Sequence, residues 1–322
     1  MARAQVGRTS GWVVGRAAGA PVVLSPGWVV AATVLTVVVA PVARRVAPGL
    51  DTVGVYVLAL VAVLMLFAST FLHELGHALV ARRHGIGVHQ IALTLLGGHT
   101  ELGGLAPTPR SSSLVALAGP VTNLALAGVA GALWKVLPSG GPLSWLMLAA
   151  ALTNLFVGVF NLLPGLPLDG GRVLEALVWA VTTRRRTGTT VAAWAGRVIA
   201  IGVLGWTAAS ALTSGAYDLT QIVWGVLIGA FVWSGAGQSL TAARSEHAVA
   251  TLSVRALMQP AVALPAVDRL GELDAMGFGG DAVLLGPLGE PVGYVDPAAA
   301  AAVPAPARAT TPLTAVAVPL PA

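Results

Sequence analysis

The sequence predicts a mainly α-helical, polytopic membrane protein with six transmembrane helices, a β-hairpin and a small α/β appendage at the C-terminus. Of the 322 residues, 56% are hydrophobic and only 10% are charged, whereas a soluble domain has roughly 45–50% apolar and about 25% charged residues. Six apolar runs are each long enough to cross about 30 Å of hydrocarbon. Seven of the 13 acidic residues follow residue 245. This uneven distribution separates the appendage from the membrane part.

The chain begins with a segment, residues 1–20, that carries Arg3, Arg8 and Arg16 ahead of the first apolar run. A signal peptide has this order, but the run is longer than a signal-peptide core and lacks a small-residue cleavage site. We therefore predict a cytoplasmic N-terminal segment and a retained first helix. The six predicted spans lie near residues 22–41, 54–81, 113–136, 143–163, 190–212 and 219–237.

The basic residues indicate how these spans are oriented. With the N-terminus inside, fifteen of the 18 Lys and Arg residues fall on the cytoplasmic side, and Arg44, Arg45 and Lys135 fall outside. Cytoplasmic loops carry such an excess, so both termini are predicted to be cytoplasmic in the cell membrane. The net charge of +5 does not indicate a nucleic-acid partner, because the Arg residues do not gather with aromatics on one soluble face.

Residues 86–105 have strand-like apolar stretches on either side of Gly97 and Gly98, which leave open two short strands or a surface loop. The edge of a hairpin can pair with an extended peptide. An amphipathic surface loop is the alternative. We assign no metal role to the ordinary polar histidines of this region, which are His84, His89 and His99.

The acidic residues that follow residue 245 divide the rest of the chain into two parts. Residues 21–245 are predicted to form the transmembrane domain, and residues 250–322 a separate cytoplasmic module. The module has short apolar strands and a turn at PLGEP, residues 287–291. Its roughly 70 residues can bury only a small core.

The strongest chemical signal is FLHELGHALV, residues 71–80. His73 and His77 share one helix face, where two imidazoles can bind one zinc ion, and Glu74 stands beside them as a base. HExxH also occurs by chance in soluble proteins, but three ionisable groups inside an apolar span need a compensating partner. His73 lies nine residues before Arg82, which is roughly 13 Å below the cytoplasmic interface.

Cysteine is absent, so a third metal ligand must be His, Asp or Glu. Three residues in apolar surroundings could in principle supply it, namely Glu101, Asp169 and His99, although we do not assign His99 to the metal. Asp169 is favoured because it lies in NLLPGLPLDGGR, residues 161–172, where prolines break the helix. Such a break is tolerated at membrane depth only where it lines a cavity. The alternative is an interfacial loop in which Asp169 caps the next helix.

Three motifs together resemble the site-2 protease family of intramembrane zinc metalloproteases. They are HELGH at 73–77, AGPVTN at 118–123 and N-x2-P-x2-PLDGG at 161–171. The likeness spans roughly residues 10–185, and it implies that residues 86–105 form a membrane-associated β-hairpin.

The resemblance also implies roles for individual residues. It implies that His73, His77 and Asp169 bind one Zn²⁺ per chain, that Glu74 is the general base of peptide hydrolysis, and that Asn161 holds the substrate carbonyl or oxyanion. We interpret three further residues as close helix packing rather than chemistry, namely Gly119, Pro120 and Asn123.

The implied substrates are membrane-anchored, single-pass regulators such as anti-sigma factors, cut in or near their transmembrane segments. The tail resembles one half of a CBS pair, a regulatory module of one branch of the family, at VRALMQP (254–260) and GEPVGYV (289–295). Nucleotide binding or self-association is the expectation for such a module.

Two alternatives remain. A membrane metal-ion transporter would also place paired His and an Asp at membrane depth, although no second copy of either motif suggests the repeated halves of a transporter. The other is a catalytically inactive scaffold of the same fold.

Overall fold

The computed structural model describes the chain in two compact units, one up to Glu246 and one from His247 onward. Each unit has its own four-stranded sheet and its own apolar core. The described residues are 9–95, 97–213, 219–251, 258, 260–277 and 280–320.

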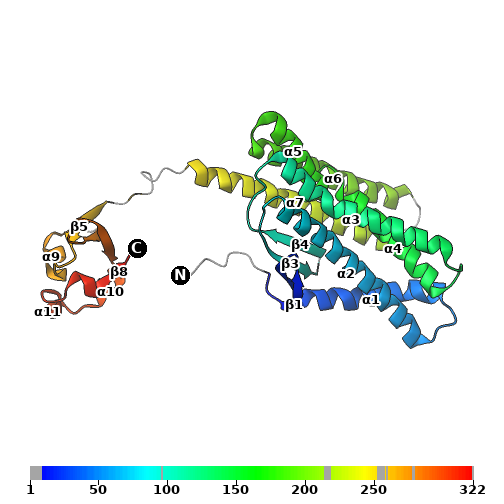
Figure 1. Cartoon of the computed structure of the whole chain (residues 1–322), viewed down its shortest axis with the longest axis horizontal. Helices are drawn as coiled ribbons and strands as arrows, with labels where there is room; N and C mark the ends of the chain where they lie inside the picture. Colours follow the sequence, from blue (N-terminus) through cyan, green and yellow to red (C-terminus); the bar gives the residue numbers. More distant parts are fainter. Residues whose placement is uncertain are drawn as a thin grey trace. The chain divides into compact units, whose positions relative to one another are not determined.

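The first unit is a helix bundle (Figure 1). Six of its helices are long and apolar enough to cross a membrane, which confirms the number of predicted spans within the described residues. A shorter helix, α5, packs against its neighbours α3 and α6. The helices are α1 (Pro26–Val46), α2 (Thr52–Arg83), α3 (Pro109–Val136), α4 (Pro142–Asn161), α5 (Asp169–Thr182), α6 (Arg185–Thr213) and α7 (Leu219–Thr251).

Two helix starts follow directly from local side-chain chemistry. The Asp51 carboxylate accepts a hydrogen bond of 2.8 Å from the backbone N–H of Gly54 at the start of α2. At the start of α3, Thr108 and Ser111 form a reciprocal capping box. Both arrangements satisfy N–H groups that a helix end leaves unpaired.

A mixed sheet accompanies the helices. Its strands are β1 (Trp12–Ala17), β2 (Ala20–Leu24), β3 (Val88–Thr94) and β4 (Gly97–Leu102), in that spatial order. β1–β2 and β3–β4 are antiparallel hairpins, and β2 joins them by pairing in parallel with β3. The predicted 86–105 hairpin is therefore confirmed, with β4 at one edge of the sheet.

The N-terminal hairpin differs from the sequence-based expectation. Residues 12–17 and 20–24 form strands, where we expected an N-terminal segment followed by a helix from about residue 22. Val22, Val23 and Leu24 pair with β3, and the helix begins at Pro26. The apolar strand and the apolar helix adjoin in the sequence, so hydrophobicity alone does not divide them.

The second unit is a small α/β fold, as predicted. Its sheet has the order β5-β6-β7-β8, with β5 and β6 parallel and the other pairs antiparallel. A turn with Gly289 at φ 80° joins β6 to β7 within the predicted PLGEP turn. The elements are β5 (Ala261–Pro265), α9 (Leu270–Ala275), β6 (Asp281–Leu285), β7 (Pro291–Val295), α10 (Pro297–Ala302), α11 (Ala305–Arg308), η1 (Leu313–Val316) and β8 (Ala317–Pro319).

The core of this unit contains Leu264, Leu270, Leu284 and Leu313. Most of the VRALMQP segment, on which the resemblance to a CBS module partly depends, lies outside the described residues. The CBS-like assignment therefore stays a prediction.

Candidate metal centre

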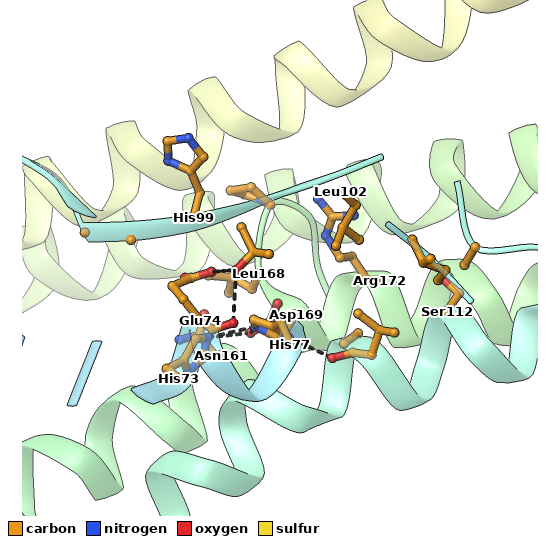
Figure 2. A pocket seen from close by; sticks show the side chains of 18 of the residues that line it. His73, Glu74, His77, His99, Leu102, Ser112, Asn161, Leu168, Asp169 and Arg172 are labelled. Carbon is orange, nitrogen blue, oxygen red and sulfur yellow. Dashed lines mark hydrogen bonds and ion pairs between the residues drawn. The ribbon is translucent and has the colours of Figure 1, made fainter. Parts of the chain in front are cut away.

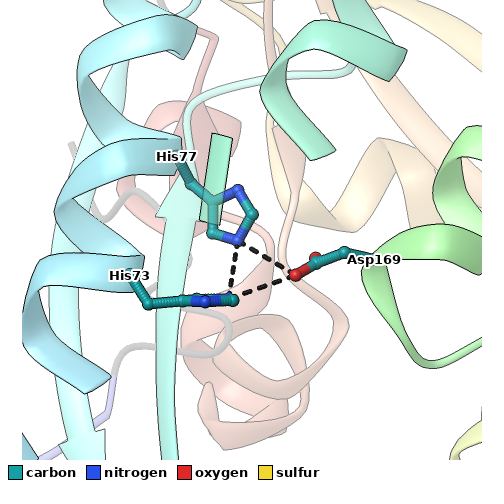
Figure 3. Close-up of side chains that lie close together, drawn as sticks. All are labelled: His73, His77 and Asp169. Carbon is teal, nitrogen blue, oxygen red and sulfur yellow. Dashed lines mark hydrogen bonds and ion pairs between the residues drawn. The ribbon is translucent and has the colours of Figure 1, made fainter. Parts of the chain in front are cut away.

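Three predicted ligands meet at one point inside the helix bundle (Figure 3). Oδ2 of Asp169 lies 3.1 Å from Nε2 of His73 and 3.3 Å from Nε2 of His77. The two Nε2 atoms are 3.1 Å apart. Both histidines are buried in α2, and Asp169 is the first residue of α5. Among the described residues, this is the one group of His, Asp and Glu side chains spaced to hold a metal ion.

The local sequence explains how Asp169 reaches the histidines. α4 ends at Asn161, and the chain turns through a proline-containing loop before α5 begins. The loop and α5 approach so closely that a Cβ on Gly171 would lie 2.2 Å from the carbonyl carbon of Gly165. Leu168 is the N-cap of α5, and no side chain caps the helix. The carboxylate of Asp169 instead contacts both imidazoles, so the helix-cap alternative is wrong.

The second nitrogen of each imidazole fixes where the lone pair lies. Nδ1 of His77 lies 2.7 Å from the backbone oxygen of Val115, and Nδ1 of His73 is hydrogen-bonded to Oδ1 of Asn123. A backbone carbonyl can only accept, so Nδ1 of His77 donates, and in the neutral ring Nε2 then carries a lone pair. The same tautomer at His73 directs two lone pairs and a carboxylate at one point. Such an arrangement is repulsive without a cation, and it is how metal-binding histidines are usually held.

The spacing of the three ligand atoms also fits zinc. Ligands at the usual zinc distances of about 2.0–2.2 Å in tetrahedral geometry lie about 3.3–3.6 Å from one another, slightly above the three separations of 3.1–3.3 Å. Gly119 of α3 leaves the space open. A Cβ at that position would lie 2.3 Å from Nε2 of His77 and 2.5 Å from Nε2 of His73. A side chain there would compete with an ion for the same volume.

Glu74 is held by the edge strand of the sheet. The hydroxyl of Thr100, in β4, lies 2.8 Å from Oε2 of Glu74 and 3.0 Å from its backbone oxygen. Gly98, also in β4, leaves room for this contact, since a Cβ there would lie 2.7 Å from Cγ of Glu74. The hairpin therefore fixes the carboxylate next to the two histidines.

A cavity of about 740 Å³ joins these groups (Figure 2). His73, Glu74, His77, Asn161 and Asp169 all line it, together with residues of β4. Within the described part of the chain, the Asn161 amide has no hydrogen-bond partner, so it is free to bind a ligand in the cavity.

The other candidate ligands are engaged elsewhere. Oε1 of Glu101 accepts a hydrogen bond of 2.9 Å from Gln90, and it lies 3.8 Å from Nε2 of His99. The same nitrogen of His99 is 3.0 Å from the hydroxyl of Thr9. Neither residue belongs to the group that contains Asp169.

Sequence reasoning missed two functional contacts. It assigned Asn123 to helix packing, but this side chain binds the ring of a predicted ligand. The position of Asn123 in AGPVTN was the available signal, because a buried amide beside a metal helix needs a partner. Thr100 gave no signal, because only the folded hairpin brings it to Glu74.

Comparisons with known proteins agree with this geometry. Residues 61–143 and 135–204 match the profile of peptidase family M50. The protein named "Putative zinc metalloprotease Rip3" of Mycobacterium tuberculosis is 39% identical over 214 residues, which cover 64% of this chain and 52% of Rip3. A protein of Synechocystis, also named a "Putative zinc metalloprotease", is 35% identical over 228 residues, which cover 70% of this chain and 59% of that protein.

Two proteins of Methanocaldococcus jannaschii add to these matches. One, also designated a zinc metalloprotease, is 34% identical over 147 residues, which cover 39% of this chain and 75% of the relative. The solved structure of the site-2 protease from that organism has a TM-score of 0.50 at 25% identity, covering 72% of this chain and 95% of that one. The chain thus spans only 52–59% of the length of the first two relatives.

Proposed function

The chain belongs to peptidase family M50, and on that premise we propose that it is an intramembrane zinc metalloprotease. One observation carries the proposal. Two imidazole lone pairs and the Asp169 carboxylate converge at 3.1–3.3 Å beside Glu74, in a cavity among apolar helices. An ion-binding site next to a carboxylate base is the arrangement used for metal-assisted peptide hydrolysis.

His73, His77 and Asp169 would hold the zinc ion and leave a fourth position open, as in other catalytic zinc sites. When bound, zinc supplies a Lewis acid that lowers the pKa of water toward 7 and polarises a carbonyl.

The residues of the chain supply the proton transfers. Glu74 removes a proton from the attacking water and returns it to the leaving amine. Thr100 keeps one oxygen of Glu74 occupied, which leaves the other oxygen for the water. Asn161, on the wall of the cavity, donates a hydrogen bond to the developing oxyanion.

The substrates we propose are single-pass, membrane-anchored regulators, with anti-sigma factors as one example, cut in or near their transmembrane segments. A substrate helix shields its own amides, so it must unwind before attack. β4 is an edge strand that lines the cavity, and an unwound segment would add to this edge as a further strand.

The six apolar helices and the uneven distribution of Lys and Arg support a proposal on location. We propose a multi-pass protein of the cell membrane, with six spans and both termini in the cytoplasm. The C-terminal unit would act there as a CBS-like regulatory module that binds a nucleotide or associates with a second copy.

Substitution of Glu74 tests the proposal. The purified chain is incubated with a tagged single-span membrane protein, and zinc content is measured in parallel. Glu74→Gln should retain zinc and lower cleavage by about 10²–10⁴-fold, the usual contribution of a general base. Glu272→Gln makes the same chemical change on the exposed surface of the C-terminal unit and should cleave like the wild type.

Three outcomes would oppose the proposal. Undiminished cleavage by Glu74→Gln would remove the assigned base. Zinc binding without cleavage by the wild type would support an inactive scaffold. Zinc uptake into vesicles, equal in the wild type and in Glu74→Gln, would support a transporter.

A further inference from the structure

We propose that Asn154, in α4, is a positioning residue for the zinc ligand His73, acting through Asn123 in α3. The inference builds on the proposed function in one respect, the assignment of His73 as a zinc ligand. Asn154 belongs to none of the three motifs, and it does not line the cavity.

A chain of buried amides connects Asn154 to the metal centre. Nδ2 of Asn154 donates to the backbone oxygen of Ala150 and to the hydroxyl of Ser69, each at 2.9 Å. Nδ2 of Asn123 donates to Oδ1 of Asn154, also at 2.9 Å. Oδ1 of Asn123 is hydrogen-bonded to Nδ1 of His73. Asn123 is 1% exposed and Asn154 is 3% exposed, so bulk water cannot replace these bonds.

The backbone oxygen of Ala150 fixes which group donates in each hydrogen bond between Asn154 and His73. The backbone oxygen of Ala150 is only an acceptor, so Asn154 must turn its NH2 group toward it. The oxygen of Asn154 then faces Asn123, which must present its own NH2 group. The oxygen of Asn123 therefore faces His73, and Nδ1 of that ring must carry the proton. The lone pair is left on Nε2, 3.1 Å from Asp169.

The two histidines are thus held by different means. His77 donates directly to the backbone oxygen of Val115, which no substitution removes. His73 depends on two side chains, and without Asn154 the amide of Asn123 loses the partner that fixes its orientation. A rotated Asn123 would present NH2 to the ring and favour the proton on Nε2, where the metal should bind.

Zinc affinity provides the test. The purified full-length chain is titrated against a chromophoric zinc chelator, with helix content measured by circular dichroism. Asn154→Leu should weaken zinc binding about tenfold, the lower end of the effect of losing an outer partner of a metal ligand. The control is Thr153→Val, which removes a neighbouring hydroxyl that bonds only within α4 and should leave affinity unchanged.

A second variant background, Asn123→Asp, distinguishes a positioning role of Asn154 from a role in helix packing. Asn123→Asp places a carboxylate, which can only accept, beside His73 and so fixes the tautomer without help from Asn154. In that background, Asn154→Leu should cause no further loss of zinc affinity. A pure packing role would give the same loss in both backgrounds.

The outcomes are distinguishable. Wild-type zinc affinity in Asn154→Leu, or an equal loss in both backgrounds, overturns this inference and leaves the proposed function intact. Failure of the wild type to bind zinc contradicts the proposed function instead. If Asn154→Leu does not fold, Asn154→Ala removes the amide without added bulk and is judged by the same comparison.

Discussion

In the helical unit, buried polar side chains lie among apolar helices, whereas in the C-terminal unit the described buried side chains are all apolar. A buried polar group without a partner costs roughly 1–3 kcal/mol, and more if it is charged. In the helical unit, the buried side chains of Ser69, Asn154, Asn123 and His73 form a hydrogen-bonded network. That network ends at His73, on the wall of the cavity. The C-terminal unit keeps its charges at the surface, as in the pair between Asp274 and Arg308.

The contrast separates two kinds of constraint. In the first unit, buried polar side chains such as His73, Glu74 and Asn123 are held by specific hydrogen bonds, at a cost in desolvation. In the second unit, burial of leucines supplies stability without specifying any reaction. Substitutions in the helical unit should accordingly change zinc content or activity, whereas substitutions in the C-terminal unit should change stability.

The largest effect is expected for Asp169→Ala. Loss of the third ligand should remove zinc, which we expect at about one ion per wild-type chain. Metal analysis of the purified protein checks this. Asp281→Ala, at an exposed position of the C-terminal unit, should keep its zinc. A full zinc complement in Asp169→Ala would point to Glu101 or His99 as the ligand.

The next largest effect is expected on the stability of the C-terminal unit. Leu284 is 1% exposed in its core, so Leu284→Ala should destabilise that unit by about 2–5 kcal/mol. Amide hydrogen exchange of β6 and β7 should speed up, while zinc content stays unchanged. The matched control is Leu288→Ala, because Leu288 is 94% exposed and the change should stay within about 0.5 kcal/mol. A loss of zinc in Leu284→Ala would break the separation between the units.

A smaller effect is expected where the hairpin meets Glu74, the proposed base. Thr100→Val removes the hydroxyl that holds Glu74, and one such bond is worth about 1 kcal/mol. We expect kcat to fall about fivefold to tenfold with KM and zinc content unchanged. Thr100→Ser should restore the rate, because it keeps the hydroxyl. An unrestored rate would assign Thr100 to packing instead.

The smallest effect concerns the surface pair of the C-terminal unit. The hydrogen bonds of Arg308 hold the pKa of Asp274 below its ordinary value of 3.8. A carboxyl with a lowered pKa stabilises the folded state above that ordinary value and loses the contribution as pH falls through the folded pKa. Asp274→Asn should therefore slightly reduce stability at pH 7, and its effect should shrink as pH falls through the folded pKa. Thermal unfolding as a function of pH measures the difference.

Much of this architecture could be predicted from the sequence. The long helices follow from uninterrupted apolar runs, and His73 and His77 follow from helical spacing. Asp169 followed from a broken helix together with the family motifs, because no local rule brings residues 73 and 169 together. The N-terminal hairpin, β1–β2, could not be separated from α1, since strand β2 and the helix are both apolar and adjacent in the sequence.

The contacts that orient the catalytic groups were beyond sequence reasoning for another reason. Thr100 reaches Glu74 across 26 residues, and Asn154 reaches Asn123 across 31. Threonine and asparagine are common in helices and strands of every class, so neither position stands out. Only the folded chain reveals which of these polar side chains has a directional task.

The open space beside Gly119 has an evolutionary consequence. Alanine is usually favoured over glycine inside a helix by about 1 kcal/mol, so Gly119→Ala would rank as a harmless or improving change by any helix scale. Here the added methyl would lie 2.3 Å from a ligand nitrogen and displace the ion. A single-residue step could thus turn the proposed protease into a stable, metal-free pseudoenzyme, and the residue at this position is the first to inspect when relatives are sorted into active and inactive ones.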